Sequence, residues 1–251
     1  MIVIVGAPTQ IGQMVAKKLN EENFNYLVLT GVNDTISDEL VQQSVQYWHW
    51  VSYSQLNDWI KDQADEIEFI IWCDSLQATI NQTLFADFWQ AAYQFQIPFL
   101  ALTEQEGLFY RLTKNLTTPF FWSVLIVQNL YFLSDQVESN PGENQLQTIK
   151  LPTLLSRLTS DKATPEILSI TFADDVVDLV YFFIHHREVS GVYHLPFQHI
   201  SSSYFDSSEA NLRLPKGKLE LANWPEEAQD YQHTLAKIGY IHPFQTIQDI
   251  I

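Results

Sequence analysis

The sequence predicts an α/β protein built on a doubly wound parallel sheet. Three observations predict it: a short β-branched run opens the chain, short apolar runs then alternate with amphipathic helical patterns, and this alternation continues through the first half. Parallel strands need long crossover connections, which helices usually supply. A strict order of strand and helix therefore favours a parallel sheet with helices on both faces.

The first three elements form a βαβ unit. Residues 1–5 are apolar, mostly β-branched, and end at Gly6, as expected of a strand buried on both faces. Residues 10–20 carry four apolar side chains at helical spacing, and residues 26–29 are the next strand.

The same patterns predict the remaining elements of the first half. We expect helices at 34–44, 54–64, 82–94 and 107–116, and strands at 48–51, 69–73, 98–102 and 120–127. Ser54 is expected to cap the helix that it begins, because a serine hydroxyl can accept a hydrogen bond from a free amide of the first turn.

The pattern changes after Leu133, where a polar stretch contains Pro141 and Gly142 and marks a loop or an excursion from the core. The expected order then resumes with helices at 153–158, 174–185 and 226–238, and strands at 167–172 and 192–195. Two regions result: a Rossmann-like nucleotide-binding core of residues 1–130, and a smaller C-terminal substrate region of residues 131–251, packed partly back on the core.

Composition restricts the classes of partner. Thirteen Lys and Arg against thirty Asp and Glu give a net charge of −17, which repels a phosphate backbone, so we expect no nucleic-acid partner. We expect no signal peptide, and no apolar run approaches the ~20 residues of a membrane helix. The single cysteine, Cys73, allows no internal disulfide, and we expect a cytoplasmic protein.

The most informative segment joins the first strand to the first helix, and it reads Gly6-Ala7-Pro8-Thr9-Gln10-Ile11-Gly12. Gly6 permits a tight turn and Gly12 permits close packing of helix on strand, while the helix amides face a diphosphate. Thr9 replaces the glycine that usually lets the backbone approach the phosphates. We expect Gly6, Thr9, Gln10, Ile11 and Gly12 to line the phosphates of a dinucleotide; a plain strand-to-helix turn is the alternative.

With this loop in place, the chain resembles the extended short-chain dehydrogenase/reductase superfamily, and most closely the sugar-nucleotide enzymes of the dTDP-4-dehydrorhamnose reductase type. Residues 170–178 are similar to the family's strand followed by a DVVD helix start, and residues 190–195 to its SGVYHL strand. The resemblance implies NAD or NADP as cofactor, and reduction or epimerisation of a nucleotide sugar or a related carbonyl compound.

The resemblance also implies catalytic residues. Tyr110 and Lys114 stand four positions apart on one face of a predicted helix, where an ammonium lowers the pKa of a phenol and makes proton exchange with a carbonyl feasible. Lys114 would also hold the nicotinamide ribose, and Thr103 at the preceding strand end would bind the substrate hydroxyl. An aromatic packing residue beside a solvated lysine explains the same pair.

The chain departs from the family pattern near the expected cofactor. Trp72 stands where the family has small residues, and its indole would fill the nucleotide groove if it turned toward the loop. At the end of the second strand, Thr30 and Gly31 replace the acidic ligand of the adenosine ribose, which leaves Asp34 as the nearest carboxylate. The loop between Thr103 and Tyr110 is also shorter than in the family.

Two functions therefore stay open. One is the NAD(P)-dependent enzyme; the other is a catalytically inactive relative with a binding, scaffolding or regulatory role, either of them as a homo-oligomer or with a protein partner.

Four histidines lie within fifteen positions but match no metal-ligand spacing, so no metal is expected; they are His185, His186, His194 and His199.

Overall fold

The computed structural model describes residues 1–33, 44–75, 79–103, 112–113, 116–117, 119–127, 130–131, 148–149, 167–201, 226–242 and 244. These residues fall into two compact units. The first contains the described residues of Met1–Ile126 and Val177–Tyr193, and the second contains those of 127–176 and 194–251. The division expected at residue 130 stays a prediction.

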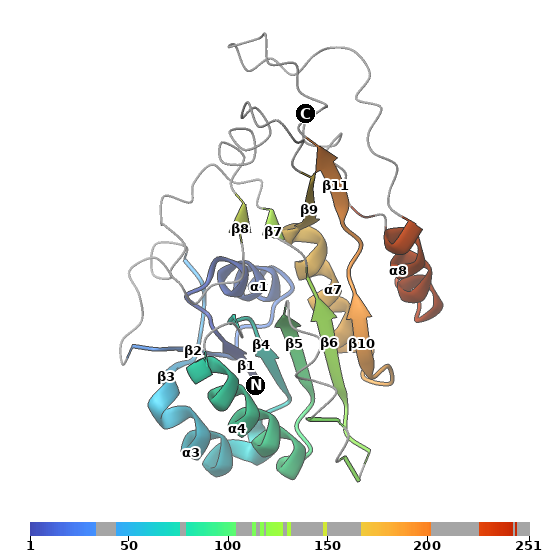
Figure 1. Cartoon of the computed structure of the whole chain (residues 1–251). Helices are drawn as coiled ribbons and strands as arrows, with labels where there is room; N and C mark the ends of the chain where they lie inside the picture. The colour runs from blue at the N-terminus through green and yellow to red at the C-terminus, as the bar shows by residue number, and fades with distance from the viewer. Residues whose placement is uncertain are drawn as a thin grey trace. The chain divides into compact units, whose positions relative to one another are not determined.

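A seven-stranded sheet forms the centre of the first unit (Figure 1). In the order of the sheet, its strands are β10 (Gly191–His194), β6 (Trp122–Ile126), β5 (Phe99–Thr103), β4 (Phe69–Trp72), β1 (Ile2–Val5), β2 (Leu27–Gly31) and β3 (His49–Ser52). The pairings of β1 with β2 and β4, of β2 with β3, and of β5 with β4 and β6 are all parallel. The predicted doubly wound α/β fold is confirmed.

Helices connect these strands. They are α1 (Gln10–Glu21), α3 (Tyr53–Gln63) with a short 3-10 turn η1 (Ala64–Glu66), and α4 (Thr79–Phe95); a further helix, α7 (Ala173–His185), leads into β10. Strand β1 is buried along its whole length, as its β-branched sequence predicts. The helices expected at 34–44, 107–116 and 153–158 lie wholly or mostly outside the described residues.

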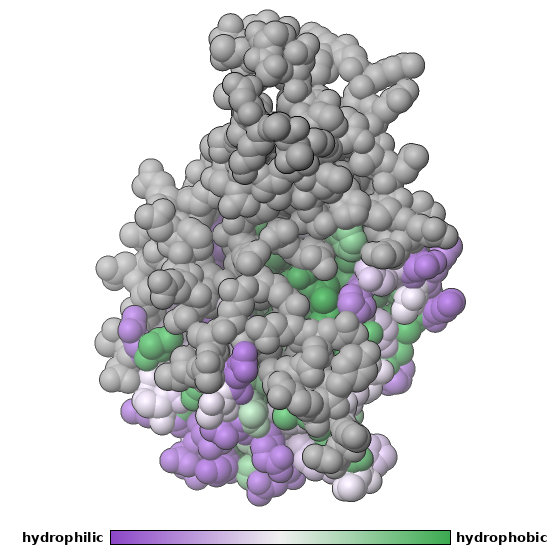
Figure 2. Space-filling view, viewed as in Figure 1, coloured by the Kyte–Doolittle hydropathy of each residue, from purple (hydrophilic) through white to green (hydrophobic). Residues whose placement is uncertain are grey.

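Aromatic side chains fill the layer between the sheet and the adjacent helices α3 and α4. Trp72 of β4 lies with its ring centroid 5.0 Å from that of Phe85 and 6.0 Å from that of Phe88, both on α4. Trp89 contacts Phe99 edge to face at 5.5 Å. The outer side of these helices is polar, as the hydrophilic surface over them shows (Figure 2). Burial of this apolar area is the main force that holds the layer on the sheet.

Helix α3 begins one residue earlier than the sequence predicts, and its N-cap lies two residues earlier. Its N-cap is Ser52, in extended conformation, and Ser54 lies inside the first turn; the predicted cap at Ser54 is wrong. The Ser52 hydroxyl makes no capping bond and instead lies 2.9 Å from the Ser54 hydroxyl. The physical reason is that β3 runs directly into α3, so the last strand residue takes the cap position.

The second unit contains a four-stranded sheet, whose strands in order are β11 (Gln198–Ser201), β9 (Ile167–Phe172), β7 (Leu130–Tyr131) and β8 (Thr148–Ile149). Helix α8 (Glu226–Lys237) belongs to the same unit and ends before Gly239, whose φ of +95° is a left-handed conformation that favours glycine after a helix end. The short strands β7, β8 and β11 were not predicted. None of the described helices combines the length and hydropathy that a membrane crossing needs.

Removing the Thr30 hydroxyl should stabilise the protein. In the described part of the chain, Thr30 Oγ1 is the one buried side-chain oxygen or nitrogen without a hydrogen-bond partner. Thr30→Val keeps the side-chain shape and deletes this unsatisfied group, so the free energy of unfolding should rise by about 1 kcal/mol, measured by urea denaturation.

The matched control is Ser123→Ala. The Ser123 hydroxyl is buried and donates to the Val189 carbonyl at 2.9 Å, so its removal should lower the free energy of unfolding. A Thr30→Val protein that is less stable than wild type would show that the hydroxyl has a partner.

Candidate functional site

The candidate site lies at the carboxyl ends of three neighbouring strands. Val5 of β1 pairs with Trp72 of β4, and Trp72 pairs with Ala101 of β5. The chain leaves β1 toward β2 and β3 and returns as β4 on the other side, so the strand order reverses between β1 and β4. In open α/β sheets ligands bind in the crevice beyond the strand ends at such a switch point.

The loop after β1 packs directly against the end of β4. Gly6 has φ +82°, and a Cβ added to it would lie 2.9 Å from the backbone nitrogen of Asp74. A Cβ added to Gly12 would lie 2.2 Å from the carbonyl oxygen of Gly6. Both positions therefore require glycine, the first for its backbone conformation and the second for space.

Thr9 closes this loop. It is the N-cap of α1, and its hydroxyl accepts a hydrogen bond from the Gly12 amide at 3.1 Å. The same hydroxyl donates to the Gly6 carbonyl at 2.7 Å and lies 3.2 Å from the Cys73 carbonyl. The hydroxyl is thus fully engaged inside the loop, and the Thr9 amide also donates to the Gly6 carbonyl, at 3.0 Å.

The amides of Gln10 and Ile11 are the groups best placed for an anion. They occupy the first two positions of α1, where the helix supplies no acceptor, whereas the next two amides bond to the side chain and carbonyl of Thr9. The Gln13 side chain braces the loop by donating to the Pro8 carbonyl at 2.9 Å. Two free amides and the positive end of the helix dipole fit a diphosphate.

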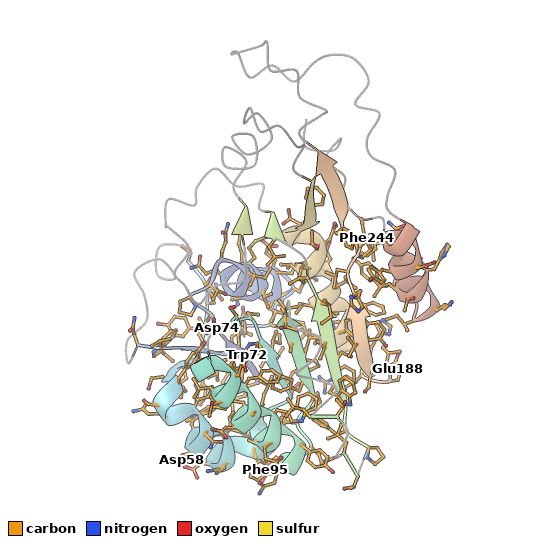
Figure 3. All side chains as sticks on the ribbon, in the orientation of Figure 1. Asp58, Trp72, Asp74, Phe95, Glu188 and Phe244 are labelled. Atoms are coloured by element: carbon orange, nitrogen blue, oxygen red, sulfur yellow. The ribbon has the colours of Figure 1, made fainter. Side chains whose placement is uncertain are left out.

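The Trp72 indole does not fill the groove. It is fully buried in the α4 layer, and its Nε1 donates to the Asp74 carbonyl at 2.7 Å. Figure 3 shows both residues at the end of β4. The sequence-based possibility that the indole blocks the loop is wrong, because a neighbouring pair of phenylalanines on α4 offers it an apolar site on the sheet face.

Sequence reasoning missed a buried carboxyl group beside the loop. Asp74 is only 4% exposed, and its Oδ2 accepts a hydrogen bond from the Tyr53 hydroxyl at 2.7 Å. Its Oδ1 accepts from the Ser75 amide at 2.8 Å. The available signal was a carboxylate directly after an apolar strand, at the edge where ligands bind.

Burial controls the ionisation of this pair. It raises the pKa of Asp74 to about 6, and the hydrogen bonds from Tyr53 and Ser75 oppose the shift. Burial and the neighbouring Asp74 carboxylate also raise the pKa of Tyr53 well above its usual range. Tyr53 therefore stays a neutral hydrogen-bond donor, while Asp74 is charged only above about pH 6.

The end of β2 offers no side chain to a ribose. A Cβ at Gly31 would lie 2.8 Å from both Pro8 Cγ and Trp50 Cη2. The Trp50 ring is held in place by its Nε1, which donates to the Asn33 carbonyl at 3.1 Å. The predicted ribose ligand Asp34 lies outside the described residues.

The predicted catalytic residues are only partly described. Thr103 is the last residue of β5 and is fully buried. Trp72 of β4 pairs with Ala101 of β5. Asp74 and Thr103 each lie two positions after the paired residue of their strand, so both lie at the same edge of the sheet. Tyr110 and Lys114 lie outside the described residues.

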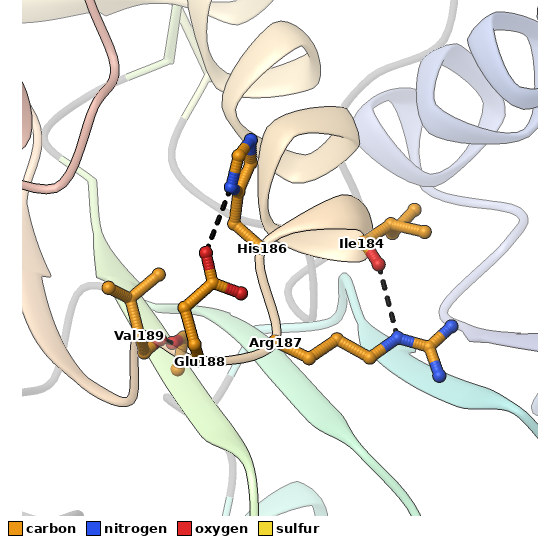
Figure 4. A network of polar contacts seen from close by, with 6 residues as sticks. Ile184, His186, Arg187, Glu188 and Val189 are labelled. Atoms are coloured by element: carbon orange, nitrogen blue, oxygen red, sulfur yellow. Dashed lines mark hydrogen bonds and ion pairs between the residues drawn. The ribbon is translucent and has the colours of Figure 1, made fainter.

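The histidine cluster and the cysteine have structural surroundings. His186 stacks on Phe182 with ring centroids 4.1 Å apart, and its Nδ1 lies 3.1 Å from a carboxylate oxygen of Glu188 beyond the end of α7 (Figure 4). Burial raises the pKa of the Cys73 thiol, which keeps it protonated. The described residues contain no group of three or more metal-ligating side chains.

No protein-family model and no curated protein matches the sequence. Solved structures do match the fold. WbmG of Bordetella bronchiseptica, solved with NAD and UDP, is 10% identical over 99% of this chain and 92% of its own, with a TM-score of 0.63. Gre2 of Candida albicans, solved with NADPH, is 12% identical over 80% of this chain and 79% of its own, with a TM-score of 0.62.

A third match is the UDP-glucose 4-epimerase of Thermus thermophilus, solved with NAD, which is 10% identical over 80% of this chain and 79% of its own, with a TM-score of 0.55. At these identities the likeness establishes a shared fold. The specific resemblance to the dTDP-4-dehydrorhamnose reductase type stays a prediction.

Neutralising Asp74 should change how stability depends on pH. The folded state raises the pKa of Asp74 from 3.8 to about 6, so it binds the proton more tightly than the unfolded chain does. The stability that this contributes is present below about pH 4 and is lost as pH rises to about 6. Asp74→Asn lacks this titration. Its free energy of unfolding relative to that of wild type should therefore increase by up to about 3 kcal/mol as pH rises from about 4 to about 6, measured by denaturation across pH.

Asp58→Asn is the control for this measurement. The Asp58 side chain is 87% exposed on α3 and pairs with Lys61. Its substitution should leave the stability difference from wild type flat between pH 4 and 6. An Asp74→Asn profile parallel to that of wild type would contradict the raised pKa.

Proposed function

We propose that the chain is an NAD(P)-dependent reductase or epimerase that acts on a nucleotide sugar or a related carbonyl compound. The observation that carries the proposal is the pair of free amides at Gln10 and Ile11, which opens α1 at the switch point of a doubly wound sheet. This is the position at which such sheets bind the diphosphate of a dinucleotide.

Each loop residue has a separate part in this binding. Gln10 and Ile11 donate their amides to the phosphates, while Gly6 and Gly12 allow the loop, the helix and the end of β4 to approach closely. Thr9 replaces a glycine and holds the loop closed with its hydroxyl. In the sequence, Asp34 is the nearest carboxylate after β2 and is the candidate ligand of the adenosine ribose, so the choice between NAD and NADP would depend on that end of the site.

The chemistry assigned to this chain is proton transfer and substrate orientation. When bound, a nicotinamide cofactor would supply or accept the hydride. Tyr110 gives its phenolic proton to the carbonyl oxygen as it becomes a hydroxyl, and takes a proton back in the reverse direction. Lys114 keeps the phenol acidic and binds the nicotinamide ribose, and Thr103 orients the substrate hydroxyl.

Structures of the same fold support the proposal, since those compared above hold NAD, NADPH or UDP. The position of Trp72 supports it as well, because the indole leaves the loop clear. A catalytically inactive relative with a binding, scaffolding or regulatory role remains the alternative outcome of the tests below.

A proline at position 10 should weaken cofactor binding selectively. Gln10 is the first residue of α1, where proline is well tolerated, and Thr9 has φ −68° and ψ 154°, which suits a residue before proline. Gln10→Pro deletes one amide donor and should weaken NADH and NADPH binding about tenfold, measured by calorimetry.

Gln10→Ala is its matched control, because it removes the side chain and keeps the amide. It should bind the dinucleotides as wild type does. Equal affinity in the two variants would show that this amide holds no phosphate. Wild-type protein that shows no thermal shift with millimolar NADH or NADPH would support the inactive relative instead.

Removing the Tyr110 hydroxyl should separate chemistry from binding. Tyr110→Phe should abolish reduction or epimerisation of the nucleotide sugar and leave dinucleotide affinity nearly unchanged, because the phenol acts only on the reacting oxygen. Turnover would be followed by absorbance of the reduced nicotinamide or by product analysis. Unchanged turnover would remove Tyr110 from the mechanism.

A further inference from the structure

The loop that is proposed to bind the diphosphate packs directly against Asp74, a buried acidic residue. The backbone of Asp74 lies against Gly6 so closely that an added Cβ would reach 2.9 Å from its nitrogen. Thr9 contacts the preceding carbonyl, that of Cys73, at 3.2 Å. Asp74 is therefore itself part of the surface against which this loop packs, since its own Cβ would lie 3.0 Å from the atom added at Gly6.

The groups that face this carboxyl do not neutralise it. From α3 comes the Tyr53 hydroxyl, and from the end of β4 come the Cys73 thiol and the Ser75 amide. The loop from Gly6 to Gly12 contains no charged residue, and neither does β5. In the described part of the chain, no cation contributes to the ionisation of Asp74.

We propose that dinucleotide binding at this loop is coupled to uptake of a proton by Asp74, so that the buried carboxyl group sets the pH range in which the site accepts a diphosphate. The inference rests on the proposed function, because it takes the diphosphate to bind at the α1 amides. An ionised carboxylate in a buried, weakly polarisable site repels a neighbouring anion, whereas the neutral acid does not. By linkage, the anion favours the protonated acid to the same extent.

Tyr53 tunes this coupling. Its hydroxyl donates to Oδ2 at 2.7 Å and so stabilises the ionised form of Asp74, which lowers the pKa of the carboxyl group against the effect of burial. Without that hydroxyl the acid would hold its proton to higher pH. Substitutions at these two residues should therefore have different effects on the pH dependence of binding. Asp74→Asn removes the titratable carboxyl group, whereas Tyr53→Phe keeps that group and shifts its titration to higher pH.

The test is calorimetric titration with NAD+ from about pH 5 to about pH 8, because the charge of its diphosphate stays constant over this range. Wild-type affinity should rise about tenfold as pH falls through the titration of Asp74. Asp74→Asn should bind with no such pH dependence and more tightly than wild type at the upper end. Tyr53→Phe should keep the transition and shift it to higher pH.

Asp58→Asn, on the exposed side of α3, is the control and should keep the wild-type transition. Proton uptake is measured independently by comparing binding enthalpies in buffers of different ionisation enthalpy, which needs only wild-type protein. Binding without pH dependence or proton uptake in wild type overturns this inference and leaves the proposed function standing. No binding of NAD+ at any pH overturns both this inference and the proposed function. If Asp74→Asn keeps the pH dependence of affinity seen in wild type, the titrating group is another residue and the inference is wrong.

Discussion

The close contact between Gly6 and the backbone of Asp74 is the constraint on which the candidate site depends. It brings the loop after β1 against the end of β4 with no room for a side chain between them. The contact fixes where α1 begins and therefore where its free amides point. It also places the Asp74 carboxyl group beside the loop after β1, so that the same packing positions the α1 amides and the titratable group next to them.

Thr9 shows how a residue that departs from a glycine pattern can preserve the architecture. Its hydroxyl caps α1 through the Gly12 amide and ties the loop to the Gly6 carbonyl. A glycine at this position would give the loop conformational freedom, whereas the threonine holds the loop through hydrogen bonds. These bonds leave the first two amides of α1 available to a ligand. The substitution thus changes what holds the loop together and keeps the donors that a diphosphate needs.

The buried acid is unfavourable for folding at neutral pH, since burial opposes its ionisation. Proteins concentrate such unfavourable arrangements at functional sites, where they serve binding or catalysis. The Tyr53 hydroxyl offsets part of the cost, because it donates to the carboxylate from a ring that is itself buried. The result is a group whose charge responds to pH and to any anion bound nearby.

Apolar periodicity and glycine placement are local properties, so they sufficed to predict the chain order of the main strands and helices and the loop between β1 and α1. The sequence could not determine the side to which Trp72 turns, the cap at Ser52, the two-residue strands or the role of Asp74. Each of these depends on partners distant in the chain, as in the contact between Asp74 and Tyr53, which are 21 positions apart. Only the tertiary structure brings such groups together, since it decides which strand ends are neighbours and which side chains pack between them.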